Sequence, residues 1–291
     1  MHPYRPPTRR MPPQVYWRRR AAAATVVLLV GFGGARLAGV GDEAPDPDDE
    51  LASLVDEDTT TTTTTVIPPP ECTDGEVPAR QDPESQWDVI LVDKARTVGD
   101  RFGPKDLYVI THAGFADSDE MVRSFVIADL GAMRTAAEQN GTPFSVIAGY
   151  RSYAQQAELY DRRTQQLGEA VAPSRVARAG HSEHQLGTTI DVGPVGQSDV
   201  TQAWAVSPEA QWIATNAHLY GFILSYPAGA ESRTCYDYEP WHLRYVGRQR
   251  AADIVASGLT LREYLYKLEV ETLGPPPETT TTTSTTAAPA R

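Results

Sequence analysis

The amino-acid sequence predicts an α+β or mixed α/β domain, and three observations support this class. Segments with the apolar spacing of helices alternate with short β-type runs between about residues 119 and 268. No glycine-rich phosphate loop and no dinucleotide-binding fingerprint accompanies this alternation. Hydrophobic residues make up 41% of the chain and charged residues 22%, an ordinary globular mixture that excludes wholesale disorder, collagen and a polytopic membrane protein.

The first predicted elements are a helix over Asp119–Asn140 and the strand that follows it. Apolar residues recur in this helix at steps of three and four residues, and Asn140-Gly141 is a stop signal. Pro143 then opens the run FSVIAGY, which predicts a strand to Tyr150 because it is rich in β-branched and aromatic residues.

A capping box marks the start of the second helix. Ser152 precedes Gln155 by three residues, the spacing at which each side chain caps a backbone N–H of the other, so we expect a helix over about residues 153–167. The run from Thr188 to Val192 predicts a second strand. The remaining predicted elements are a helix from Pro208 to about Leu219 that ends at Gly221, short strands at 222–224 and 242–246, and a last helix at 261–268.

The N-terminal segment carries six arginines and no acid in residues 1–20, followed by fifteen uncharged residues from Ala21 to Ala35. As a helix they would span roughly 22 Å, less than the ~30 Å hydrocarbon core of a bilayer. This pattern fits a secretory signal peptide, a single membrane anchor that continues through Val40, or a buried globular helix. The first two place the rest of the chain outside the cytoplasm by the positive-inside rule, and this is the expected location.

Low-complexity segments flank the part of the chain that can fold. Residues 42–58 hold nine acids and no base, Thr59–Thr65 are seven consecutive threonines, and the C-terminus is again rich in Thr and Pro. Such segments bury too little apolar surface to offset the entropy of ordering them, and they act as spacers. The predicted organisation is a basic cytoplasmic n-region (1–20), a signal peptide or anchor (21–40), a disordered linker (41–71), one folded domain (72–271) and a disordered tail (272–291).

The chain is acidic, with a net charge of −12 from 26 Lys and Arg against 38 Asp and Glu. A protein that binds duplex nucleic acid needs a basic face to neutralise phosphates, so we expect no nucleic-acid partner. Nothing in the residues implies a protein partner.

The two cysteines, Cys72 and Cys235, lie near opposite ends of the predicted domain. In a cytosolic chain they would be free thiols. Outside the cytoplasm an even number of cysteines favours a disulfide, so we expect Cys72 and Cys235 to be bonded to each other.

Two histidines and one aspartate have the pattern of a zinc site. His184 stands seven residues before Asp191, and His242 lies far downstream, three residues after Glu239. Two neutral imidazoles and one carboxylate hold zinc with a fourth position left for water, whose pKa the ion lowers toward neutrality. Glu239 is then the candidate for the general base that takes the water proton and passes it to a leaving amine.

Each of these residues has a structural alternative when it is taken singly. A lone histidine is more often a hydrogen-bonded structural residue, and Asp191 alone suits a turn. His181 lies three residues before His184, which is the spacing of a helical two-histidine site. Gly180 and Gly187 bracket this stretch and argue against a helix there, so His181 is the weaker ligand candidate.

Three strings in a fixed order resemble the zinc D-alanyl-D-alanine carboxypeptidases of the VanY type. They are GYRSYAQQ from Gly149, GHSEHQLGTTIDVG from Gly180 and YEPWHLRYVG from Tyr238. The segment LVDKARTVGDRFGPKDL from Leu91 also resembles the N-terminal segment of that family, so the resemblance covers about residues 91–247. It implies an α+β zinc metallopeptidase domain with a small antiparallel sheet flanked by helices, similar to the Hedgehog and D-Ala-D-Ala peptidases.

The resemblance also implies roles for the matching residues. The implied Zn²⁺ ligands are His184, Asp191 and His242. Glu239 is the implied general base, and Arg151 is the implied arginine that polarises the scissile carbonyl, a task that suits a fixed guanidinium. The residues expected to line the substrate site are Ser182, Gln156 and Trp241, although core packing is an equally good interpretation of the tryptophan.

The implied activity is removal of the terminal D-Ala from peptidoglycan stem peptides ending in D-Ala-D-Ala. A D,D-dipeptidase, or an endopeptidase acting on L-Ala–D-Glu or on a cross-bridge, is an alternative, since related folds have these activities and pocket shape decides between them. A zinc-stabilised cell-wall-binding module without catalysis is a third alternative. The expected location is the cell envelope, with the protein either anchored or secreted.

Overall fold

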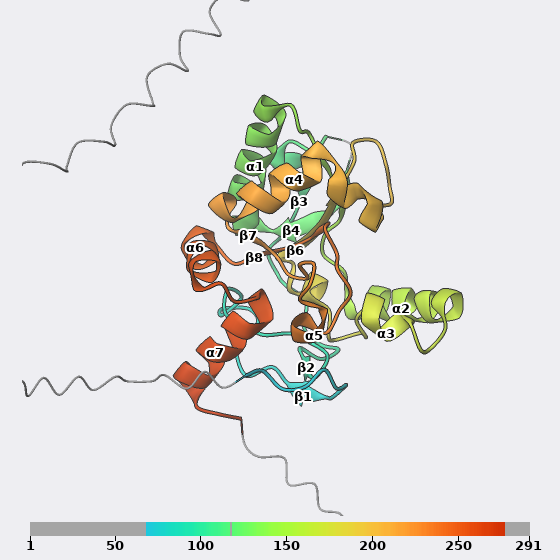
Figure 1. Cartoon of the computed structure of the whole chain (residues 1–291), viewed down its shortest axis with the longest axis vertical. Helices are drawn as coiled ribbons and strands as arrows, with labels where there is room; N and C mark the ends of the chain where they lie inside the picture. The colour runs from blue at the N-terminus through green and yellow to red at the C-terminus, as the bar shows by residue number, and fades with distance from the viewer. Residues whose placement is uncertain (1–67, 117, 277–291) are drawn as a thin grey trace, which may run out of the picture. The chain divides into compact units, whose positions relative to one another are not determined.

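A four-stranded antiparallel sheet lies at the centre of the protein (Figure 1). The computed structural model describes residues 68–116 and 118–276. The strands of this sheet follow in the spatial order β5 (Ser145–Ala148), β6 (Thr189–Gly193), β8 (His242–Tyr245) and β7 (Phe222–Leu224). All three pairings between them are antiparallel, so the expected small antiparallel sheet is confirmed.

Helices and two short ladders surround this sheet. The α-helices of the described residues are α1 (Ile127–Asn140), α2 (Tyr153–Leu167), α3 (Ala172–Arg175), α4 (Pro208–Asn216), α5 (Glu231–Thr234), α6 (Arg248–Ser257) and α7 (Leu261–Leu273). The ladders are the parallel pair β1 (Val77–Pro78) and β2 (Arg96–Thr97), and the antiparallel pair β3 (Leu107–Val109) and β4 (Met121–Arg123). Figure 1 shows α1 and α4 packed together beside the sheet, with α2 and α3 on another side.

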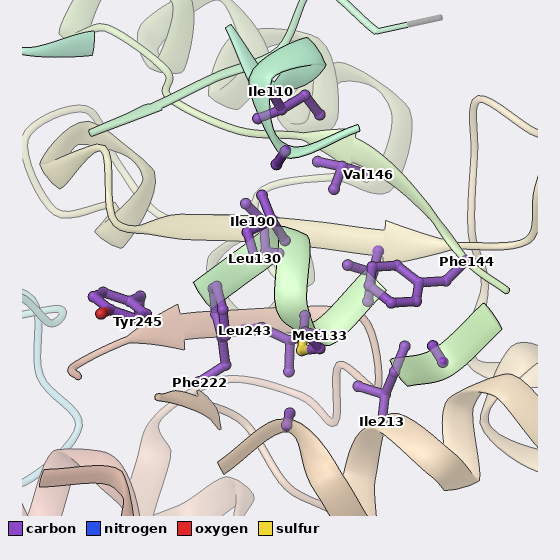
Figure 2. Close-up of a cluster of buried hydrophobic side chains, with 14 of the residues drawn as sticks. Ile110, Leu130, Met133, Phe144, Val146, Ile190, Ile213, Phe222, Leu243 and Tyr245 are labelled. Atoms are coloured by element: carbon purple, nitrogen blue, oxygen red, sulfur yellow. The ribbon is translucent and has the colours of Figure 1, made fainter. Parts of the chain in front are cut away.

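The main core lies between α1, α4 and one face of the sheet. Leu130 and Met133 of α1 have no solvent exposure, and they pack with Ile190 of β6 and Leu243 of β8 (Figure 2). Ile213 joins them from α4. Truncating a buried side chain of this size typically costs about 2–5 kcal/mol. This packing holds β6 and β8 in one register.

The first predicted helix is correct only over its second part. Met121–Arg123 is strand β4 and residues 124–126 form a single 3-10 turn, so the α-helix begins at Ile127. Backbone pairing with β3 stabilises the extended conformation, and the N–H of Arg123 also donates to the carbonyl of Gly187 at 2.8 Å. The helix ends as predicted, at Gly141 in the left-handed conformation with φ 78°.

Local signals predicted the other elements more closely. Ser152 and Gln155 form both hydrogen bonds of the capping box, and α2 has the predicted bounds. Helix α4 begins at Pro208 as predicted and continues as a 3-10 turn, η6 (Ala217–Tyr220), to Gly221. The last helix runs to Leu273, five residues beyond its expected end. Helix α6 was not predicted, since it follows Gly247 and has no side-chain cap.

The predicted disulfide between Cys72 and Cys235 is present, with its two Cα atoms 5.2 Å apart. It joins the beginning of the domain to the segment that leads into β8. Arg262 of α7 also donates to the carbonyl of Pro70 at 2.9 Å. The disulfide and this hydrogen bond therefore both attach residues 70–72 to the rest of the domain.

Several predicted segments lie outside the described residues. They are the basic n-region, the signal or anchor segment at 21–40, the linker up to residue 67, and the tail from residue 277. Their assignments stay predictions. Within residues 68–116 and 118–276, no helix combines the length and the hydrophobicity that a bilayer crossing requires.

Candidate active site

His184 lies in a short, buried 3-10 turn, η4 (Glu183–Leu186), which ends at Gly187 with φ 70°. Its Nδ1 donates to the carbonyl oxygen of Gly149 at 2.7 Å, since a carbonyl can only accept. This bond fixes both the ring and its tautomer. The other ring nitrogen, Nε2, then faces Asp191, whose Oδ2 is 3.3 Å away.

Asp191 and His242 meet because they are direct partners in the sheet. The antiparallel register of β6 and β8 pairs Asp191 with His242. The Oδ1 atom of Asp191 is 3.3 Å from Nδ1 of His242, and the two imidazole rings of His184 and His242 are perpendicular, with centroids 5.0 Å apart. The described structure therefore brings the three sequence-predicted ligands together.

The three groups are arranged as a cation site. His242 donates its Nε2 hydrogen to Glu183 Oε2 at 3.0 Å, which leaves the Nδ1 lone pair directed at Asp191. One ligand atom from each residue lies within 4.8 Å of the others, and Asp191 Oδ1 is buried without a hydrogen-bond partner. Converging acceptors repel one another unless a proton or a metal cation lies between them. Two imidazole nitrogens and one carboxylate oxygen suit Zn²⁺.

The charges around the ligands favour a cation as well. Burial lowers the pKa of His184 and so keeps its imidazole neutral. Burial alone would raise the pKa of Asp191, but His184 and His242 hold it well below its usual value. Burial alone would likewise lower the pKa of His242, but the adjacent carboxylates of Asp191 and Glu183 raise it to about 10. This raised pKa favours a proton on Nδ1 when no metal is bound, and a metal ion bound between Nδ1 and Asp191 takes the place of that proton.

Glu239 lies at the open side of the ligand cluster, in the segment just before β8. Its backbone N–H donates to the carbonyl of Tyr226 at 3.1 Å, and its Oε2 lies 3.4 Å from Nδ1 of His242. Burial raises the pKa of Glu239 to about 8; the charge of His242 opposes this rise and that of Asp191 adds to it. A bound divalent cation would lower the pKa again.

Arg151 reaches the same place from the end of β5. Its Nη2 is 4.0 Å from Asp191 Oδ2, and its Nη1 donates to Gln156 Oε1 at 2.8 Å. The amide nitrogen of Gln156 in turn donates to the carbonyl of Ala177 at 2.6 Å. Both ends of the Gln156 amide thus have protein partners, and the side chain lines the same cavity as Arg151.

These residues line a cavity of about 260 Å³. Ser182, Trp241 and the two tyrosines Tyr226 and Tyr236 also line it. Trp241 packs against the main core and also lines the cavity, so its role toward a substrate stays a prediction. A second groove of about 460 Å³ shares Glu239 and Trp241 with the cavity and continues past them between α2 and the segment before α4.

His181 lies away from the cluster. Its Nδ1 donates to the carbonyl of Asp93 at 2.9 Å, and its Nε2 is 3.4 Å from Glu76. The cluster of metal-ligating groups found among the described residues contains His184, Asp191 and His242 without it. In the described structure His181 is therefore not one of the clustered residues.

Sequence reasoning missed the residues behind the ligands. Glu183 and Arg244 are buried next to His242, and Arg244 Nη1 donates to Glu183 Oε1 at 3.1 Å. Burial alone would raise the pKa of Glu183, but the hydrogen bond from His242 and the charge of Arg244 lower it to about 2. The two-residue period of a strand, which puts Arg244 on the same face as His242, is the signal that could have found Arg244.

The chain is similar to known carboxypeptidases. Residues 119–248 match the family VanY, described as D-alanyl-D-alanine carboxypeptidase. The chain is 36% identical over 194 residues to YodJ of Bacillus subtilis (strain 168), covering 65% of this chain and 70% of that protein.

Two solved structures are similar in both sequence and fold. The LdcB LD-carboxypeptidase has a TM-score of 0.55 and 34% identity, covering 61% of this chain and 85% of that one. A mutant of the vancomycin resistance D,D-pentapeptidase VanY in complex with Zn(II) has a TM-score of 0.53 and 29% identity, covering 62% of this chain and 99% of that one.

Proposed function

Because the chain belongs to the VanY family, we propose that it is a zinc-dependent D-alanyl-D-alanine carboxypeptidase that removes the terminal D-Ala from peptidoglycan stem peptides. The observation that carries this proposal is the convergence of His184, Asp191 and His242, with Glu239 3.4 Å from the ligand nitrogen of His242. A cation-binding cluster alone would suit a structural zinc site. A buried carboxylate and a guanidinium at its open side suit catalysis.

The residues divide the work of hydrolysis between them. Zn²⁺ held by His184, Asp191 and His242 supplies Lewis acidity toward the scissile carbonyl and toward water. Glu239 takes the proton from the attacking water and delivers it to the amine of the departing D-Ala. Arg151, held by Gln156, donates hydrogen bonds to the carbonyl oxygen as negative charge develops on it.

The shape of the cleft favours a peptide longer than the dipeptide D-Ala-D-Ala. The groove of about 460 Å³ that continues past Trp241 has room for residues preceding the scissile bond. Arg163 and Arg175 line both the cavity and this groove, together with Asp199, so the extension can pair with acidic and basic groups of a stem peptide. A pure dipeptidase has no use for such an extension.

The similarity to LdcB makes an L,D-carboxypeptidase the second candidate, because that structure combines the higher TM-score with 34% identity. The two activities differ in the substrate that they shorten. A D,D-carboxypeptidase converts a stem pentapeptide into a tetrapeptide, and an L,D-carboxypeptidase converts a tetrapeptide into a tripeptide.

The test is product analysis with a defined substrate. Zinc-loaded protein is mixed with UDP-muramyl-pentapeptide or the matching tetrapeptide, with and without a chelator, and the products are identified by mass spectrometry. We expect loss of one D-Ala from the pentapeptide and no reaction in chelator. Cleavage of the tetrapeptide alone would assign the L,D activity, and release of a dipeptide would assign the dipeptidase.

We further propose that the domain works outside the cytoplasm. The Cys72–Cys235 disulfide supports this location, since disulfides persist in oxidising compartments. The arginine-rich start and the apolar segment at 21–40 support export by a signal peptide or attachment by an anchor. Fractionation of cells that carry the full chain, followed by N-terminal sequencing, separates the cleaved form from the anchored one.

A further inference from the structure

We propose that Glu183 is a positioning residue of the metal site, whose carboxylate fixes the ring orientation and tautomer of His242. The inference rests on the proposed zinc site. Glu183 is not part of the wall of the cavity of about 260 Å³. It acts through His242, which it holds so that Nδ1 points at Asp191 and the bound metal.

Both carboxylate oxygens of Glu183 accept hydrogen bonds from other protein groups. Oε2 accepts hydrogen bonds from His242 Nε2 at 3.0 Å and from Ser225 Oγ at 2.6 Å. Oε1 accepts from Arg244 Nη1 at 3.1 Å. The residue is 5% exposed, so these three contacts replace water almost completely.

Arg244 compensates the burial of this negative charge. It is two residues after His242 on β8 and has no solvent exposure. Its Nη2 donates to the carbonyl of Trp87 at 2.8 Å, which fixes the guanidinium beside Glu183. A buried carboxylate without such a partner would be strongly destabilising.

One turn of chain thereby orients both histidine ligands. Glu183 and His184 are adjacent in η4. The Glu183 side chain accepts a hydrogen bond from the ring of His242, whereas His184 supplies its own ring. His184 is itself a ligand, and Glu183 binds the far nitrogen of the second ligand, His242. A shift of this turn would move the two imidazoles together, so η4 couples the geometry of one ligand to that of the other.

The chemical consequence is a defined lone pair. A carboxylate accepts hydrogen bonds and cannot donate one while it is ionised, so Nε2 of His242 carries the hydrogen and Nδ1 is left free for the metal. Without Glu183 the ring can rotate and exchange tautomers. Losing a carboxylate partner of this kind typically costs about 10–100-fold in metal affinity.

The experiment compares the full-length protein with Glu183→Gln and Glu183→Ala. Zn²⁺ affinity is measured by competition with a chromophoric chelator, the ligand geometry by the visible absorption of the Co²⁺ form, and stability by thermal unfolding of the metal-free protein. We expect Glu183→Ala to weaken Zn²⁺ binding about 10–100-fold and to change the Co²⁺ spectrum. Glu183→Gln retains an acceptor oxygen, so it should lie between Glu183→Ala and the unaltered protein.

Ser225→Ala is the matched control, because it removes another hydrogen bond to the same Glu183 oxygen and leaves the contact to His242 in place. We expect it to keep the Zn²⁺ affinity and the Co²⁺ spectrum. A purely structural role of Glu183 would lower the unfolding temperature of the metal-free variants and leave Zn²⁺ affinity and the Co²⁺ spectrum unchanged, which would overturn the proposal.

If Glu183→Ala does not fold, the isosteric Glu183→Gln decides by the same two metal measurements. The outcome also separates this inference from the proposed function. An unaltered protein that binds no Zn²⁺ contradicts the proposed function itself. An unaltered protein that binds Zn²⁺ and releases D-Ala, with Glu183 variants that bind Zn²⁺ equally well, contradicts only the positioning role.

Discussion

Asp191 and His242 lie directly opposite each other on neighbouring antiparallel strands, and the facing oxygen and nitrogen atoms are 3.3 Å apart. This single pair joins two of the sequence motifs, since one residue belongs to the segment after Gly180 and the other to the segment after Tyr238. The register of the sheet therefore builds most of the metal site. The predictions below test the parts around it.

Replacing Glu239 with Gln should abolish turnover without removing the metal. The amide cannot accept the proton of the attacking water, so we expect kcat for D-Ala release to fall by about 10²–10⁴-fold. The three ligands are unchanged, and the zinc content should stay the same. Near-normal hydrolysis by this variant would contradict the role of Glu239 as general base.

Arg151→Ala should lower kcat by about 10²–10³-fold, because it removes the hydrogen bonds to the developing oxyanion. Zinc content should be retained. Arg162→Ala is the control, since Arg162 is exposed on α2 and is not part of the cavity wall. Equal rates for the two variants would show that Arg151 has no role in the chemical step.

Gly149→Ala should displace the backbone that orients His184 and so weaken the metal site. An added Cβ would lie 2.5 Å from the carbonyl oxygen of Met121, and this backbone cannot move aside easily. The displaced strand end would carry away the carbonyl that orients His184. We expect about 1–3 kcal/mol of lost stability, as for other overpacked sites, together with weaker Zn²⁺ binding.

The control for this variant is Gly168→Ala. Gly168 has φ 82°, so alanine is strained there as well, but its Cβ would meet no atom within 4 Å. We expect a loss of stability of about 1 kcal/mol, with Zn²⁺ affinity intact. If Gly149→Ala behaves in the same way, the contact between Gly149 and His184 has no role in metal binding.

Removing the disulfide with the paired change Cys72→Ser and Cys235→Ser should lower the free energy of unfolding by about 2–5 kcal/mol. The bridge closes a loop with a sequence separation of 163 residues, and its loss frees the unfolded chain. Urea unfolding with and without reductant checks this. The unaltered protein should lose stability in reductant, whereas the double variant should not respond.

Asp106 gives a pH dependence of stability that is separate from the metal site. Burial alone would raise its pKa, but the hydrogen bonds from Arg123 and Ser124 hold the pKa below the usual value of 3.8. The stabilisation is therefore present at neutral pH and is lost as the pH falls through the lowered pKa. We expect Asp106→Asn to cost about 1 kcal/mol at pH 7, because the ion pair is partly exposed and screened.

The same Asp106→Asn variant should match the unaltered protein at a pH below the lowered pKa of Asp106 in the folded state, where both side chains are neutral. Urea midpoints at neutral and at acidic pH give the comparison. A difference that stays constant across this range would mean that the charge of Asp106 contributes nothing.

The sequence alone determined the features that depend on neighbours along the chain. The Ser152–Gln155 capping box, the stop of α1 at Gly141 and the start of α4 at Pro208 are local, and all three agree with the structure. The same holds for the residue types of the candidate ligands, because metal chemistry selects imidazole and carboxylate wherever the fold places them.

Only the tertiary structure decided the features that depend on distant partners. Met121–Arg123 forms a strand although the spacing of its apolar residues predicts a helix, because its backbone hydrogen-bonds to β3 and to Gly187. Glu183 forms a hydrogen bond with His242, which is 59 positions away in the sequence, and no local sequence pattern predicts that contact. Hydrogen bonds and packing between segments far apart in the chain form only on folding, and for this reason they leave no periodic trace in the sequence.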